Sequence, residues 1–194
     1  MPPAIFFDRD DTLIECRAVT ADGDLGDPAL VALRPHALRV CRELKEAGYR
    51  LVVVSNQGGV ARGKYAETDV QAVNSETNRL LHNLIDAFYF CPFHPKGTVP
   101  RYTREHPSRK PAPGMLLQAA SDFTLDLETS WLIGDALRDC QAAHAAGVRS
   151  ILLTHLLDKS ALADLAQNPA VDHLAEDLPA AADIILHSKS QSPA

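Results

Sequence analysis

The sequence predicts an α/β fold in three layers, in which a Rossmann-like parallel sheet is covered by helices on both faces. Three observations predict it: short apolar runs recur along the chain, helix-like stretches separate them, and glycines follow two of these stretches. Strand, helix and strand in alternation imply right-handed crossovers between parallel strands. A functional site is then expected at the carboxyl ends of the strands.

Four runs rich in aromatic and β-branched residues are expected to be strands covered on both faces. They are AIFF at 4–7, LVVV at 51–54, WLIG at 131–134 and SILL at 150–153. All of them are far shorter than the roughly 20 apolar residues of a transmembrane helix. The sequence therefore predicts no membrane span.

Three helices are expected between these strands. Residues 36–47 and 136–146 are each followed by a glycine in the position of a C-terminal cap. A third helix is expected to begin at Thr68, which stands in capping-box register with Gln71. Apolar residues continue at nearly helical spacing as far as Phe88, so this helix is predicted to reach that residue.

Residues 91–114 interrupt the alternation and hold six of the thirteen prolines. Proline restricts φ and lowers the entropy of a free loop, which favours a long but ordered loop. From 96 to 110 the loop carries five Lys or Arg against one Glu. We expect one domain over 1–187 with a basic, proline-rich loop at 92–113, no large cap domain, and a flexible tail at 188–194.

Composition narrows the classes of function. With 46% hydrophobic and 23% charged residues, 194 residues can bury one substantial core. The net charge of -6 argues against nucleic acid or an anionic membrane as partner. Four scattered cysteines and the lack of a signal peptide favour a reducing setting. We expect a cytoplasmic monomer that acts on a small molecule.

Acidic residues crowd onto the turn after the first predicted strand, at Asp8, Asp10 and Asp11. Asp8 and Asp10 can converge on one pocket while Arg9 points elsewhere. Without compensation the two carboxylates would raise each other's pKa, whereas a bound Mg²⁺ would keep both ionised. An isolated Asp-x-Asp is more often a solvated turn or a helix cap, so the hypothesis needs support from elsewhere in the chain.

Two more polar clusters follow predicted strands. Ser55 and the backbone N–H groups around Asn56 suit an oxygen anion, although a glycine-rich turn is an equal alternative. Asp135 follows a third strand, with Asp139 one helical turn later, and each could equally be a helix cap. Because parallel strands end at one edge of the sheet, we expect these groups to lie close together.

Arg109 and Lys110 supply cations suited to phosphate oxygens, although such a pair alone is more often surface charge. In chain order DRDDT, SNQGGVARG, RKPAPGM and IGDALRD resemble the four motifs of the haloacid dehalogenase (HAD) superfamily of phosphohydrolases. SNQGGVARG and RKPAPGM resemble the histidinol-phosphatase-like branch in particular, which includes heptose bisphosphate phosphatases. The resemblance extends over about residues 4–150.

This resemblance implies a Mg²⁺-dependent phosphomonoesterase with a HAD-like fold. Asp8 would be the nucleophile that forms an aspartyl-phosphate. Asp10 would be the general acid toward the leaving alkoxide and then the general base toward water. Mg²⁺ would be held by Asp8, the backbone carbonyl of Asp10, and Asp135.

The same resemblance assigns the groups around the phosphate. Ser55 and Lys110 would stabilise the phosphoryl oxygens, and Asn56, Arg109 and Lys110 would bind the substrate. The basic loop at 92–110 and the segment at 15–30 would shape the pocket. The expected substrate is a sugar phosphate such as D-glycero-D-manno-heptose 1,7-bisphosphate.

Heptose bisphosphate phosphatases of the best-known type bind a structural zinc in this loop, through Cys-x-His and Cys-x-Cys. Here the corresponding residues are Cys91, Phe93, His106 and Ser108. A tetrahedral site of that pattern cannot form, and a regrouped site of Cys91, His94 and His106 lacks a fourth ligand. Zinc is therefore not expected.

Other departures concern the substrate more than the chemistry. Asp11 stands where the branch usually has Gly, and Ala136 where heptose phosphatases often have Lys. Histidinol phosphate is therefore an alternative substrate. A receiver-like phosphoacceptor domain is an alternative of another class, but such a domain has no need of an acid/base group at Asp10. An inactive binding protein is disfavoured because every expected catalytic position is filled.

Overall fold

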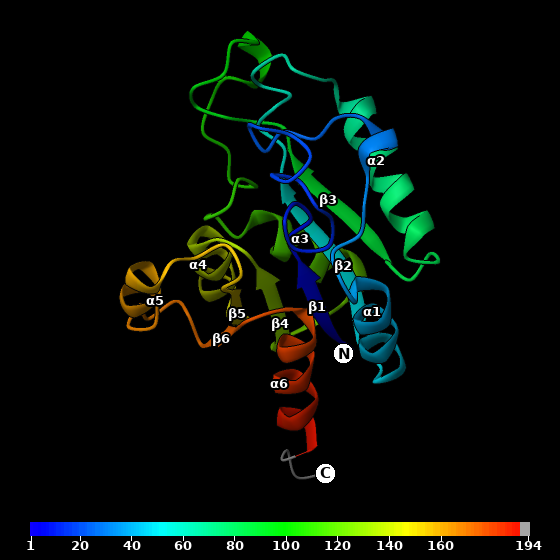
Figure 1. Cartoon of the computed structure of the whole chain (residues 1–194), viewed down its shortest axis with the longest axis vertical. Helices are drawn as coiled ribbons and strands as arrows, with labels where there is room; N and C mark the ends of the chain where they lie inside the picture. Colours follow the sequence, from blue (N-terminus) through cyan, green and yellow to red (C-terminus); the bar gives the residue numbers. More distant parts are fainter. Residues whose placement is uncertain (191–194) are drawn as a thin grey trace.

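The computed structural model describes residues 1–190, which form a six-stranded sheet flanked by helices (Figure 1). The strand order is β3-β2-β1-β4-β5-β6, and every neighbouring pair is parallel. The strands are β1 Pro3–Phe7, β2 Arg50–Asn56, β3 Ala87–Cys91, β4 Asp126–Gly134, β5 Arg149–Leu153 and β6 His173–Ala175. The helices are α1 Ala37–Glu46, α2 Glu67–Leu80, α3 Gly114–Phe123, α4 Leu137–Ala145, α5 Lys159–Leu165 and α6 Leu178–Ser190.

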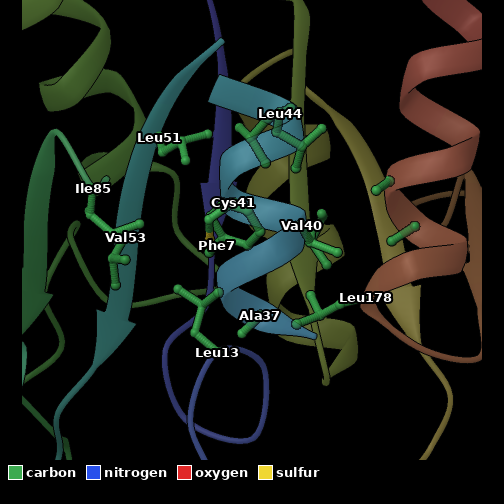
Figure 2. Close-up of a cluster of buried hydrophobic side chains, with 14 of the residues drawn as sticks. Phe7, Leu13, Ala37, Val40, Cys41, Leu44, Leu51, Val53, Ile85 and Leu178 are labelled. Atoms are coloured by element: carbon green, nitrogen blue, oxygen red, sulfur yellow. The ribbon is translucent and has the colours of Figure 1, made fainter. Parts of the chain in front are cut away.

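Successive residues of β1 pack on opposite faces of the sheet. Phe7 belongs to a cluster with the apolar side of α1 and with α6 (Figure 2), whereas Phe6 packs in a second cluster with α3 and α4. Both rings are fully buried, and burying such a side chain stabilises a fold by about 1.5–3 kcal/mol. The predicted three-layer α/β fold is confirmed.

The four strands predicted from apolar runs all lie within observed strands, β1, β2, β4 and β5. The helices predicted at 36–47 and 136–146 correspond to α1 and α4, and Gly48 and Gly147 after them have φ of 91° and 72°. The α2 capping box differs from the prediction. The Asp69 carboxylate accepts the Ala66 backbone N–H at 2.7 Å, in place of the expected Thr68 and Gln71 pair.

The helix predicted from Thr68 to Phe88 is wrong beyond Leu80. The chain leaves α2 through His82 and Asn83, whose φ angles of 53° and 59° are left-handed. Phe88 then lies in β3 and pairs with Val53 of β2. A short apolar stretch fits either period, and the left-handed pair that ends the helix leaves no mark on hydrophobic spacing.

The loops after β1, β2 and β3 gather beyond the carboxyl ends of these strands, at the top of the view in Figure 1. The 92–113 loop contains a 3₁₀ turn at Pro100–Tyr102, and Thr98 N–H donates to the Ala61 carbonyl at 2.7 Å. At the carboxyl terminus, a flexible tail was expected at 188–194, but α6 extends through residues 188–190. Residues 191–194 lie outside the described residues. Over 1–190, no helix combines the length and apolarity needed to cross a bilayer.

Candidate active site

The acidic residues meet where β1 and β4 end. Asp8 directly follows β1, and its N–H donates to the carbonyl of Ile133 in β4 at 2.9 Å. This register sets Asp8 beside Asp135, which directly follows β4. Carboxylate oxygens of Asp8, Asp135 and Asp139 lie within 4.8 Å of one another, and all three residues are buried. The structure thus brings together acids from two of the predicted strand ends.

Lys110 reaches this acidic group from the end of the 92–113 loop. Its side chain is buried, and its Nζ lies 2.7 Å from Asp8 Oδ1, 2.6 Å from Asp139 Oδ1 and 2.7 Å from the Val54 carbonyl. Burial alone would lower the lysine pKa, but the charges of Asp139 and Asp8 raise it. Burial would likewise raise the pKa of Asp8, but Lys110 and Arg138 hold it below the usual value. These cations therefore favour the ionised form of Asp8, which the expected role of nucleophile requires.

The acidic group fits a divalent cation. Asp135 Oδ2 accepts a hydrogen bond from Arg17 at 3.1 Å, while its buried Oδ1 has no hydrogen-bond partner among residues 1–190. Burial and the charges of Asp8 and Asp139 raise the pKa of Asp135 to about 7. An unpaired carboxylate oxygen beside other carboxylates suits the oxygen-only coordination of Mg²⁺. Asp10 was expected as a ligand through its backbone, and its carboxylate lies outside this group.

The fully buried Arg9 guanidinium forms an ion pair with the Asp10 carboxylate. Arg9 Nε lies 3.0 Å from Asp10 Oδ1 and Nη2 lies 3.2 Å from Oδ2. As predicted, Arg9 does not point into the pocket that Asp8 and Asp10 line. Its fully buried guanidinium needs acceptors and takes the adjacent acid as one of them. Burial raises the pKa of Asp10; Arg9 opposes the rise, and the negative charge of Asp8 adds to it. A raised pKa suits a general acid.

Two amides at the end of β2, those of Asn56 and Gln57, hold other residues of the site. Gln57 Nε2 donates to both Asp10 Oδ2 and Ser55 Oγ, each at 2.7 Å. Asn56 clamps the backbone of Lys110: its Nδ2 donates to the Lys110 carbonyl at 2.9 Å and its Oδ1 accepts the Lys110 N–H at 3.0 Å. The expected substrate ligand Asn56 therefore also fixes the loop that carries the lysine.

A cleft of ≈ 110 Å³ opens onto the acids. The segment expected to shape the pocket contributes Arg17, Asp22 and Gly23, all of which line the cleft. Its full lining is Asp8, Asp10, Asp11, Arg17, Asp22, Gly23, Asn56 and Arg138. Only a compact, polar group can reach the acids through so small a space.

Sequence reasoning missed both arginines of this cleft. Arg17 lies 3.1 Å from Asp135 Oδ2 and 3.4 Å from Asp11 Oδ2. Arg138 in the first turn of α4 is solvent-exposed and lines the cleft. Its place beside Asp139 in the fourth motif was a usable signal, whereas nothing in the sequence around Arg17 marked it.

Asp11 occupies a left-handed backbone position, with φ of 58°. Its Oδ1 accepts the N–H groups of Cys16 at 3.0 Å and Arg17 at 2.9 Å. The usual Gly of the branch adopts this conformation without steric cost, while Asp is one of the few other residues that tolerate it. The departure at Asp11 thus keeps the turn and adds a cap for the next segment.

Arg109 lies beside the cleft rather than in its lining. Its Nη1 donates to the Phe93 carbonyl at 3.1 Å. A side chain at Gly58 would meet Arg62, His94 and Arg109, so three basic groups gather around that glycine. The structure does not bring Arg109 to the acids, and its expected role in substrate binding stays a prediction.

Aromatic stacking occupies the loop positions that correspond to zinc ligands. The rings of Phe93 and His106 stack with centroids 4.2 Å apart at 14°, and the Arg104 guanidinium lies 4.2 Å from the Phe93 centroid. His106 Nδ1 accepts the Ser108 N–H at 3.1 Å. Among residues 1–190, Cys91 and the loop histidines are not part of a three-ligand group. Residues of this kind do not fit a tetrahedral zinc site.

Comparisons with known proteins agree with this geometry. A family model described as HAD-hydrolase-like matches residues 107–181. D-glycero-beta-D-manno-heptose-1,7-bisphosphate 7-phosphatase from Yersinia pestis is 38% identical over 155 residues, which cover 78% of this chain and 79% of that protein. The protein of the same name from Escherichia coli K12 is 37% identical over 154 residues, 78% of each.

A solved structure is similar over nearly the whole chain. It is the D,D-heptose 1,7-bisphosphate phosphatase from B. bronchiseptica, in complex with magnesium and phosphate. Its TM-score is 0.78 at 28% identity, and the match covers 96% of this chain and 99% of that chain.

Proposed function

Because this chain belongs to the HAD-like phosphatase family of the heptose-1,7-bisphosphate 7-phosphatases, we propose that it hydrolyses a small sugar phosphate, D-glycero-D-manno-heptose 1,7-bisphosphate, with Mg²⁺. The chain is a phosphatase. One observation carries the proposal: a buried, ionised Asp8 is fixed by Lys110 beside Asp135, whose Oδ1 is buried and unpaired. That arrangement suits in-line attack on phosphorus next to a cation.

The first half-reaction transfers the phosphoryl group to Asp8. Lys110 occupies Oδ1, so Oδ2 is the oxygen that attacks phosphorus. The bond between phosphorus and the ester oxygen breaks, and its electron pair stays on that oxygen. Asp10 gives its proton to the same oxygen, so the sugar leaves as a neutral alcohol and Asp10 becomes a carboxylate.

The second half-reaction returns Asp8 to its starting state. Asp10 takes a proton from water as the water oxygen attacks phosphorus, and the bond between phosphorus and Asp8 Oδ2 breaks. Inorganic phosphate leaves, Asp8 is again a carboxylate, and Asp10 is again protonated. Ser55 Oγ accepts from Gln57, so its own O–H is free to donate to a phosphoryl oxygen.

Asp8, Asp135 and the backbone carbonyl of Asp10 would hold Mg²⁺. When bound, the ion would neutralise charge on the phosphoryl oxygens and keep the carboxyls of Asp8 and Asp135 ionised. Two arginines at the cleft, Arg17 and Arg138, suit a substrate with a second anionic group. This supports a bisphosphate over histidinol phosphate, which carries one phosphate and an amine.

The decisive experiment compares the purified parent chain with Asp8→Asn on heptose bisphosphate, histidinol phosphate and 4-nitrophenyl phosphate, in Mg²⁺ and in EDTA. The parent should turn over all substrates only in Mg²⁺, with the highest kcat/KM for the heptose. Asp8→Asn, which is nearly isosteric, should keep the fold and lose turnover. An Asp8→Asn variant as active as the parent would overturn the assignment of the nucleophile, and a preference for histidinol phosphate would overturn the substrate.

We also place the enzyme in the cytoplasm, as a monomer with no nucleic-acid or membrane partner. Its four cysteines, Cys16, Cys41, Cys91 and Cys140, are free and buried. This supports a reducing compartment. Light scattering on the purified chain tests the monomer directly, and a mass twice that of the chain would overturn it.

A further inference from the structure

Arg9 is a fully buried charged side chain that links the turn after β1 to α2. Its exposed fraction is 0%, and its Nη1 donates to Asn74 Oδ1 on α2 at 2.9 Å. Its Nη2 also approaches the Leu25 carbonyl at 3.4 Å. A buried guanidinium is stable only when such acceptors surround it. Arg9 is therefore fixed at its far end and cannot turn away from Asp10.

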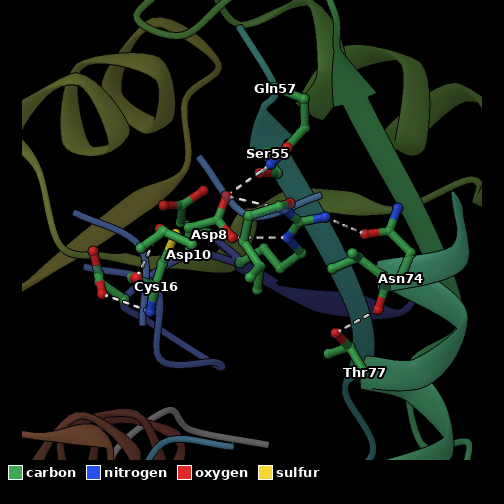
Figure 3. A network of polar contacts seen from close by, with 12 residues as sticks. Asp8, Asp10, Cys16, Ser55, Gln57, Asn74 and Thr77 are labelled. Atoms are coloured by element: carbon green, nitrogen blue, oxygen red, sulfur yellow. Dashed lines mark hydrogen bonds and ion pairs between the residues drawn. The ribbon is translucent and has the colours of Figure 1, made fainter. Parts of the chain in front are cut away.

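Gln57 holds the same carboxylate from the side of β2. Its Nε2 donates to Asp10 Oδ2 and to Ser55 Oγ, and its Oε1 accepts the Tyr65 hydroxyl at 3.0 Å. Gln57 is buried, and both N–H groups of its side-chain amide donate to Asp10 and Ser55 (Figure 3). One amide thus fixes the hydroxyl expected to face the phosphate and the acid expected to face the leaving group.

These contacts give the two carboxylate oxygens of Asp10 different numbers of hydrogen bonds. Oδ2 accepts from Arg9 Nη2 and from Gln57, which uses both of its lone pairs. Within the described part of the chain, Oδ1 accepts only from Arg9 Nε, so one lone pair remains. The Asp10 side chain is 19% exposed and lines the cleft. Oδ1 is thus the oxygen able to carry a proton toward a bound substrate.

We propose that Arg9 and Gln57 are positioning residues that orient Asp10, so that Oδ1 delivers the proton to the ester oxygen of the leaving group. The inference rests on the proposed function and deepens it. Neither residue lines the cleft. Arg9 acts through Asp10, whereas Gln57 also holds Ser55. Loss of Arg9 therefore lowers the rate mainly for substrates whose leaving oxygen needs the proton, and the test uses Arg9.

The test uses that difference between leaving groups. An alkoxide needs a proton as it departs, whereas 4-nitrophenolate does not, and kcat/KM reports the steps up to that departure. Arg9→Gln should lower kcat/KM about 100-fold for an alkyl phosphate such as glycerol 3-phosphate and less than about 5-fold for 4-nitrophenyl phosphate. Equal losses on the two substrates would show a merely structural role and overturn the proposal.

A milder pair of variants guards against misfolding of Arg9→Gln. Asn74→Leu removes the acceptor at the far end of Arg9, and should lower the ratio of alkyl to aryl kcat/KM about 3–10-fold. Asn74→Asp keeps an acceptor oxygen and should keep the ratio. Arg79→Gln changes an exposed arginine of the same helix, paired with Glu76, and should leave both rates unchanged. The same ratio in both Asn74 variants would count against the proposal.

A double-mutant cycle separates this inference from the proposed function. Asp10→Asn should lower kcat/KM for the alkyl phosphate more than for the aryl phosphate. Adding Arg9→Gln to this variant should not lower the ratio of alkyl to aryl kcat/KM any further. If Asp10→Asn shows no selective loss, the acid role in the proposed function fails. If Asp10→Asn behaves as expected while Arg9→Gln adds its own selective loss, Arg9 does not act through Asp10 and only the inference fails.

Discussion

Lys110→Met removes the cation that lies between two buried carboxylates. The lysine nitrogen is 2.7 Å from Asp8 and 2.6 Å from Asp139, and at an effective dielectric constant near 20 each attraction is about 6 kcal/mol before desolvation is subtracted. Without the lysine, Asp8 and Asp139 can avoid mutual repulsion by binding protons, which costs about 4 kcal/mol for each carboxylate at pH 7. We expect the free energy of unfolding to fall by about 3–5 kcal/mol, the usual cost of breaking a buried pair.

The pH dependence of this loss has a definite sign. Without the lysine, the pKa values of both carboxyls rise in the folded state, so the folded chain binds more protons than the unfolded chain. Destabilisation is therefore complete above the raised pKa values and fades as the pH falls toward the ordinary range near 4. The gap between parent and variant should narrow between pH 7.5 and pH 5.

Urea unfolding followed by circular dichroism measures the loss. Lys45→Met is the matched control, because Lys45 pairs with Asp86 at a site where the lysine side chain is 32% exposed. That pair should contribute no more than about 1 kcal/mol. Turnover of 4-nitrophenyl phosphate by Lys110→Met should fall at least about 1,000-fold. Equal stability losses in the two lysine variants would refute the reasoning.

Three further changes test other parts of the structure. Asp11→Ala should lower the free energy of unfolding, measured in urea, by about 1–3 kcal/mol, because alanine is strained at φ 58° and the hydrogen bonds of the Asp11 carboxylate are lost. Asparagine tolerates this backbone conformation, so Asp11→Asn should lower the free energy of unfolding by less than half as much. Burial alone would raise the pKa of Asp86, but Lys45 and neighbouring donors hold it below the usual value. The contribution of Asp86 is therefore present above pH 4 and is lost as the pH falls through the lowered pKa. Asp86→Asn should shift the urea midpoint more at pH 7 than at pH 3. Phe93→Ala removes the ring stacked on His106 and should lower Tm by about 2–6 °C, whereas treating the parent chain with a zinc chelator should leave Tm unchanged.

The sequence predicted the parts of the site whose positions depend only on the direction of the strands. Asp8 and Asp135 follow parallel neighbouring strands, so their meeting could be predicted from strand ends. Lys110 lies in an irregular loop, and only the motif resemblance pointed to it. Its hold on Asp8 depends on the Asn56 clamp, a contact between residues 54 positions apart that no local pattern encodes.

Other features depend on tertiary burial. The sequence suggests that Arg9 is a charged residue on a turn. It is fully buried, because the adjacent Asp10 and the distant Asn74 on α2 both supply hydrogen-bond acceptors. Phe88 reads as part of a helix and becomes a strand residue, because pairing with β2 overrides its spacing. In both cases the deciding partner comes from another element.

The 92–113 loop is secured at its two ends, where Cys91 closes β3 and Asn56 clamps the backbone of Lys110, and near its middle, where Thr98 N–H donates to the Ala61 carbonyl. Lengthening a flexible loop is inexpensive, since each doubling adds only about 0.6 kcal/mol of closure entropy. Added residues should therefore be tolerated best between these anchors. Engineers could graft recognition segments there to redirect the enzyme toward new phosphate esters while the hydrolytic chemistry stays intact.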